Sequence, residues 1–187
     1  MMKISKLLPC LLALTFGSCA SIDCKLDSIV VWTLSFYDSE MEEPLKLPCT
    51  LTVDAVGAGT LYNKGTGITS MLLPMSITAE TDTLLLQWNW QESGNTGAKD
   101  ETGNAFDATD VLYIDHTNRP HFDAMDCPMA VFHDITDVRL DQQPGNARQL
   151  VIDSVTITRN IVDYNDVENI RIYIHQPADT GGSVSPR

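Results

Sequence analysis

Short segments in which apolar and polar residues alternate recur along most of the chain. The clearest example is the segment 45–56, where Leu51, Val53 and Ala55 alternate with two threonines and an aspartate. A period of two residues is typical of a β-strand that has one face in the core and the other in water. Other segments are rich in the β-branched and aromatic residues that strands prefer. Together these patterns predict strands at residues 27–37, 45–56, 60–63, 69–79, 82–90, 111–116, 129–133, 150–159 and 170–175.

Polar turns separate the predicted strands, and no segment has the pattern of a helix of three turns. Residues 91–110 form the longest irregular stretch, and residues 118–120 (Asn-Arg-Pro) form a predicted turn. We therefore expect a single all-β domain, an antiparallel β-sandwich or small barrel of about eight strands. The β-sandwich domain spans residues 27–175, and the polar residues 176–187 form a disordered tail.

Residues 1–18 have the composition of an export signal. Lys3 and Lys6 precede an apolar run at residues 7–16, which is followed by small residues. These are the three parts of a secretory signal peptide. The run is too short to cross a bilayer as a permanent helix, which needs roughly 20 apolar residues.

Two cleavage sites are compatible with this signal. Gly17 and Ser18 stand directly before Cys19, an arrangement that resembles a bacterial lipobox. In that case we expect lipidation at Cys19, with residues 19–26 as the lipid-anchored tether. The alternative is cleavage by ordinary signal peptidase after Ala20, which would release the chain without an anchor.

The acidic composition restricts the class of partner. Lys and Arg number 12 and Asp and Glu 25, so the formal net charge is −13. Binding of nucleic acid through a basic face needs clustered Lys and Arg, and the composition excludes it. Anionic headgroups would also repel the protein, so attachment to a membrane requires acyl chains.

Export places the cysteines in an oxidising compartment, where disulfides form. Cys24, Cys49 and Cys127 follow the signal and Cys19. We favour a disulfide between Cys24 and Cys127, because it would tie the start of the mature chain to its middle. The alternative is that all three are reduced residues of the core.

Two groups of side chains are candidates for ligand binding. His116, His121 and His133 offer imidazole ligands for a metal ion, although no known metal-binding spacing is present. The alternative is that they are turn and edge residues. Trp88 and Trp90 share one face of a strand, where they would stack on a sugar if exposed or pack in the core if buried. No catalytic motif is present, so we expect no enzymatic activity and no cofactor.

Several short motifs together resemble an uncharacterised family of Bacteroidetes lipoproteins, a domain of unknown function. The motifs are Cys19 with the following Ser21-Ile-Asp-Cys24, Phe36-Tyr37, Leu73-Pro74, Asp126-Cys127, and Val155-Thr-Ile157 before Asn160. The resemblance implies a secreted, lipid-anchored β-protein and implies no activity. It also implies that Cys24 and Cys127 are characteristic cysteines of the family.

The sequence thus favours a non-enzymatic lipoprotein of the cell envelope. We expect Cys19 to anchor it in the outer membrane, with the β-sandwich presenting a binding or structural surface to an envelope protein or glycan. Two alternatives stay open. One is a glycan-binding module that uses Trp88 and Trp90, and the other is a metal-binding protein that uses the region from His116 to His133.

Overall fold

The computed structural model describes residues 24, 29–90, 107–125, 127–141 and 151–175. The predicted signal peptide, the predicted lipidation site Cys19, most of the predicted tether and the predicted disordered tail lie outside these residues. Within them the secondary structure is entirely β. None of the described residues belongs to a helix with the length and apolar character that a membrane span requires.

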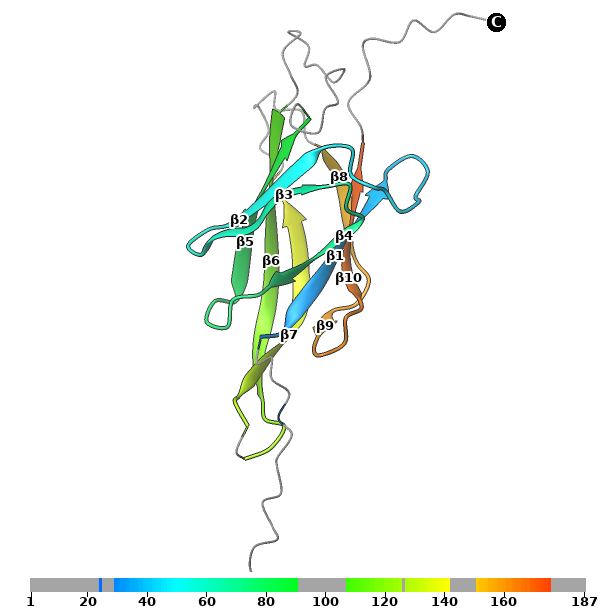
Figure 1. Cartoon of the computed structure of the whole chain (residues 1–187). Coiled ribbons are helices and arrows are strands. Elements are labelled where there is room, and N and C mark those ends of the chain that lie inside the picture. The colour runs from blue at the N-terminus through cyan, green and yellow to red at the C-terminus, as the bar shows by residue number, and fades with distance from the viewer. Residues whose placement is uncertain (1–23, 25–28, 91–106, 126, 142–150, 176–187) are drawn as a thin grey trace, which may run out of the picture.

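Ten strands of the described chain form two sheets (Figure 1). The larger sheet has the order β3-β2-β5-β6-β7-β9, and the smaller sheet has the order β4-β1-β10-β8. The strands are β1 (Val31–Asp38), β2 (Thr50–Ala55), β3 (Gly59–Thr66), β4 (Ser70–Pro74), β5 (Thr81–Asn89), β6 (Asp107–His121), β7 (Ala130–Leu140), β8 (Ile152–Ile157), β9 (Ile161–Val162) and β10 (Glu168–Ile174).

The all-β sandwich that the alternation predicts is confirmed, with one difference in strand direction. Every paired neighbour is antiparallel except β1 and β10, which run parallel in the middle of the smaller sheet. The first and last strands therefore lie side by side, so the fold closes only when both are in place. A parallel pair needs no tight turn, so it leaves no local turn signal in the sequence.

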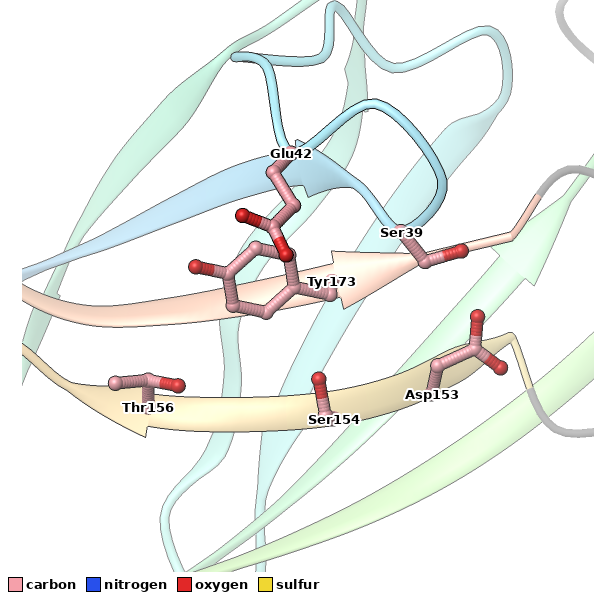
Figure 2. A pocket seen from close by; sticks show the side chains of 6 residues that line it. All are labelled: Ser39, Glu42, Asp153, Ser154, Thr156 and Tyr173. Atoms are coloured by element: carbon pink, nitrogen blue, oxygen red, sulfur yellow. The ribbon is translucent and has the colours of Figure 1, made fainter.

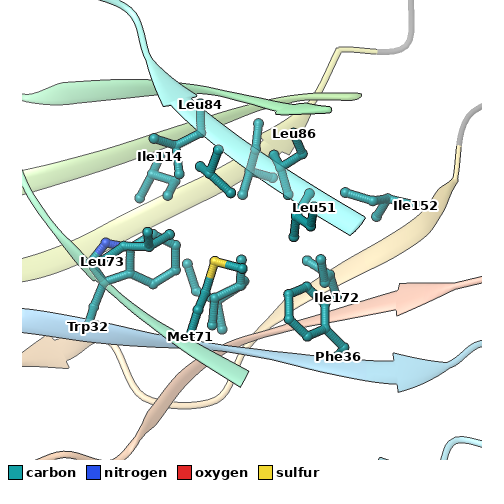
Figure 3. Packing of buried hydrophobic residues seen from close by; sticks show 14 of the residues in the cluster. Trp32, Phe36, Leu51, Met71, Leu73, Leu84, Leu86, Ile114, Ile152 and Ile172 are labelled. Atoms are coloured by element: carbon teal, nitrogen blue, oxygen red, sulfur yellow. The ribbon is translucent and has the colours of Figure 1, made fainter. Parts of the chain in front are cut away.

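The core lies between the two sheets. Side chains from β1 and β10, such as Phe36 and Ile172, face side chains from β2 and β5, such as Leu51 and Leu86 (Figure 3). In β1, β4, β5 and β10 the buried apolar side chains of the core are two residues apart, as the pleat requires. In β2 the buried Leu51 and Val53 alternate with the less buried Thr52 and Asp54, as the sequence predicts.

The largest departure from the predicted strands is the length of β6 and β7. The strand predicted at residues 111–116 extends from Asp107 to His121, and the one predicted at residues 129–133 extends from Ala130 to Leu140. The predicted turn at residues 118–120 is therefore wrong, because Asn118, Arg119 and Pro120 all pair with β7.

Proline is tolerated at this position because the strand has an open edge there. β5 begins at Thr81, opposite Asp115. Beyond His116, β6 therefore has β7 on one side and no strand of the larger sheet on the other. Proline is confined to such edges because it lacks the N–H that a second neighbour would need. As a result the β6–β7 hairpin projects from one end of the sandwich (Figure 1).

Candidate functional site

The projecting hairpin is linked covalently to the beginning of the described chain. Cys24 and Cys127 form a disulfide, with 5.5 Å between their Cα atoms and a sequence separation of 103. The alternative in which all three cysteines are reduced therefore does not describe the structure. Cys49 is the one free cysteine among the described residues, and it is buried. Burial raises the pKa of its thiol to about 12, so Cys49 is unreactive.

An aromatic collar, formed by His121, Phe132 and Tyr164, lies where the strands of the hairpin meet its loop. The His121 ring stacks on Phe132 at 4.2 Å between centroids, and Tyr164 meets Phe132 edge-on at 5.0 Å. Across the two strands, the guanidinium of Arg119 donates two hydrogen bonds to the carboxylate of Asp134. The collar and this bidentate pair hold the projecting part of the hairpin in one shape.

The end of this hairpin exposes apolar side chains. Phe122 is 63% exposed, Met129 is 46% exposed and Met125 is fully exposed. We call these three residues the apolar tip. A single exposed apolar residue is ordinary on a protein surface, but three large ones close together in the loop of a projecting hairpin mark a candidate interaction site. Asp123, the described charged residue between them, accepts hydrogen bonds from His121 Nε2 (3.1 Å) and Tyr164 Oη (3.0 Å).

The three histidines that the sequence suggests as metal ligands do not come together. His116 and His133 lie on the inner face of the hairpin, with ring centroids 5.2 Å apart. His121 packs instead on Phe132, which is next to His133 in the strand and so points to the opposite face. Among the residues that the structure describes, no group of three His, Cys, Asp or Glu side chains is arranged to hold a metal ion. The three-histidine site is therefore wrong.

The side-chain amide of Asn118 links His116 and His133 through hydrogen bonds. Asn118 Nδ2 donates to the carbonyl oxygen of Ala79 (2.8 Å), which fixes Oδ1 as the acceptor. Nδ1–H of His116 and Nδ1–H of His133 both donate to this oxygen, at 3.0 and 2.7 Å. His116 Nε2 lies 3.4 Å from a carboxylate oxygen of Asp82. The cluster thus ties the β4–β5 connection to the hairpin, which is a structural role.

The cluster predicts how stability depends on pH. Burial lowers the pKa of His133 from 6.5 to about 4, and the electrostatic interaction with His116 lowers it too. As the pH falls below 6.5, His133 is protonated in the unfolded chain but stays neutral in the folded protein. The free energy of unfolding therefore decreases as the pH falls. Between pH 7 and pH 5 we expect His133 to account for a loss of about 2 kcal/mol in the free energy of unfolding.

Urea unfolding of the wild type and of His133→Asn at both pH values measures this term. Titrating groups distant from His133 act equally in both proteins, so their contributions cancel in the comparison. We expect the wild type to lose more stability than the variant. Equal losses would mean that His133 is not held neutral in the folded protein.

Trp88 and Trp90 lie in the core, where they are 1% and 2% exposed. They offer no face to a sugar, so the stacking platform is wrong and the packing alternative holds. Trp88 meets Phe36 edge-on at 6.3 Å between centroids. Its Nε1–H donates to the carboxylate of Asp110 at 2.8 Å, inside the protein.

Asp110 is a buried carboxylate that sequence reasoning missed. Its Oδ2 accepts from Trp88 and from the backbone N–H groups of Val151 and Ile152, both at 3.2 Å, while Oδ1 has no hydrogen-bond partner among the described residues. Burial raises the pKa of Asp110 despite these donors. The alternation of faces along the strand could have identified it. Asp110 stands two residues before the buried Leu112 and so lies on the same inner face of β6.

The smaller sheet carries an open, polar hollow on its outer face. Figure 2 shows side chains from β8 and β10 below the turn that follows β1. The hollow has a volume of about 410 Å³ and is lined by Ser39, Glu42, Asp153, Ser154, Thr156 and Tyr173. Its hydroxyl and carboxylate groups can exchange hydrogen bonds with a polar ligand.

Comparison with known proteins identifies one family. No curated protein and no solved structure matches the chain. Residues 50–174 match a family of unknown function, DUF6452. The match contains every strand from β2 to β10 and one cysteine of the disulfide, Cys127. Because it covers more than half of the chain, the protein belongs to the DUF6452 family of unknown function.

Proposed function

We propose that this protein is a non-enzymatic lipoprotein of the cell envelope, anchored in the outer membrane through acyl chains on Cys19. The observation that carries the proposal is the Cys24–Cys127 disulfide. Structural disulfides form and persist in exported proteins and are rare in reducing compartments. The disulfide therefore supports the interpretation of residues 1–18 as an export signal, and the lipobox-like residues before Cys19 favour the lipidated form.

The most deeply buried titratable groups favour a structural role over catalysis. His133 and Asp110 both have shifted pKa values, and such shifts also occur in active sites. Here, however, both side chains lie inside the sandwich and bond to Asn118, Trp88 or the backbone, out of reach of a substrate. The buried titratable groups of the sandwich therefore stabilise the fold. Its outer surface is what the protein presents to an envelope protein or glycan.

Substitution of the lipidated cysteine tests the anchor. In the native host we expect the wild type in the membrane fraction and Cys19→Ala in the soluble exported fraction, because acylation needs the thiol. The change leaves small residues around the alternative cleavage site after Ala20, so export continues. Immunoblotting of the separated fractions measures the distribution.

Cys10→Ala is the matched control, because it removes a cysteine from the signal peptide itself. This variant should stay in the membrane fraction. A Cys19→Ala variant that remained as firmly membrane-bound as the wild type would overturn the proposed anchor.

A further inference from the structure

We propose that the apolar tip, formed by Phe122, Met125 and Met129, inserts into the interfacial region of the bilayer that holds the acyl anchor. The proposal rests on the lipid anchor of the proposed function and adds a second, protein-made contact with the same membrane. The ligand is the lipid surface itself, at the boundary between headgroups and acyl chains.

Covalent connectivity places the apolar tip near the membrane. The backbone from Cys19 to Cys24 spans at most about 17 Å when fully extended. The disulfide then brings the chain to Cys127, with 5.5 Å between the two Cα atoms. Cys127 lies between Met125 and Met129 in the sequence. An acyl group on Cys19 would therefore keep the end of this hairpin close to the lipid, whatever path the tether takes.

The rest of the sandwich extends away from this end. β6 runs from the hairpin end for 15 residues, a length of about 50 Å. Its far end lies beside the end of β1, because Asp38 pairs with Ile174, Ile174 pairs with Ile152, and the N–H of Ile152 donates to Asp110. Only one end of the molecule is thus held at the membrane, and that end carries the apolar tip.

The apolar tip has no basic residues, so it would bind a lipid surface without electrostatic attraction to the headgroups. Residues 120–130 contain no Lys or Arg, and the whole chain has a formal net charge of −13. Insertion must therefore be driven by apolar burial, and it should occur in vesicles without anionic lipid. The carboxylate of Asp123 is hydrogen-bonded to His121 and Tyr164 at the collar.

A tryptophan placed in the tip reports insertion. The acylated full-length variant Phe122→Trp is purified from membranes and reconstituted into vesicles of phosphatidylcholine with brominated acyl chains, which quench tryptophan at the interface. The native Trp32, Trp88 and Trp90 are buried in the core and contribute a constant background. Met41→Trp is the matched control, since Met41 is 66% exposed against 63% for Phe122 and lies beyond β1, at the opposite end.

We expect the added emission of Phe122→Trp to be quenched roughly threefold more than that of Met41→Trp. Met125→Trp serves as a second reporter in the tip if Phe122→Trp does not fold. Equal quenching of tip and control variants in acylated protein would overturn the insertion and leave the lipid anchor standing. That outcome would point to a protein partner for the tip. If the intact mass shows no acyl groups, the proposed function fails, and this inference fails with it.

Discussion

Removal of the disulfide by Cys24→Ser with Cys127→Ser is expected to lower the free energy of unfolding by about 4 kcal/mol, since the bond closes a loop of about a hundred residues in the unfolded chain. The separation of 103 residues is what makes the expected effect large. For a domain of this size the loss corresponds to a fall of about 10 °C in the midpoint of thermal unfolding. Thermal and urea unfolding of the double variant beside the wild type measure both quantities.

Reductant provides the control for this experiment. Treatment of the wild type should reproduce the midpoint of the double variant, while the double variant should not respond. Cys49 does not disturb the comparison, because it is buried and its thiol pKa is raised to about 12. If wild type and double variant unfolded at the same midpoint, the bond would contribute nothing to the stability of the sandwich.

Truncation of Trp88 to alanine is expected to cost about 3–5 kcal/mol, the usual range for a fully buried aromatic residue. Trp88 fills the space beside Phe36 and Trp90, so its removal leaves a cavity in the centre of the core. It also removes one of the donors to the buried carboxylate of Asp110. Urea unfolding should show a lower midpoint with an unchanged slope, because the fold itself is kept.

Trp88→Phe separates the two causes of that loss. Phenylalanine fills most of the cavity but has no N–H, so its cost should reflect mainly the lost hydrogen bond, about 1–2 kcal/mol. We therefore expect the order wild type, Trp88→Phe, Trp88→Ala in decreasing stability. A loss below about 1 kcal/mol for Trp88→Ala would contradict the position of this side chain in the core.

Local patterns in the sequence predict most of the sandwich because each strand carries its own signal. The alternation in β2, or the isoleucines of β10, identifies the buried face without knowledge of the neighbouring strands. The ends of β6 and β7 are different, because they depend on pairing between strands. Pro120 is a turn signal in isolation and becomes part of a strand only because β5 stops at the level of Asp115. The parallel pairing of β1 and β10 is equally non-local.

The candidate sites also divide into features that the sequence predicts and features that depend on contacts between distant residues. The link between Cys24 and Cys127 could be proposed from the sequence, since few cysteines follow the signal peptide. The role of the histidines could not, because it depends on the single amide of Asn118, whose own orientation is fixed by the carbonyl of Ala79. The apolar tip could not be predicted from the sequence either. Phe122, Met125 and Met129 have no periodic pattern, so their exposure is known only from the structure.

The most direct test of a lipid-anchored envelope protein is the intact mass of the chain from the membrane fraction of its native host, measured with and without reductant. The lipoprotein proposal predicts the mass of residues 19–187 plus acyl groups, and a gain of two hydrogens on reduction as the Cys24–Cys127 bond opens. An unmodified chain beginning at Ser21 and recovered from the soluble fraction would contradict the anchor and, with it, the placement of the apolar tip at a membrane.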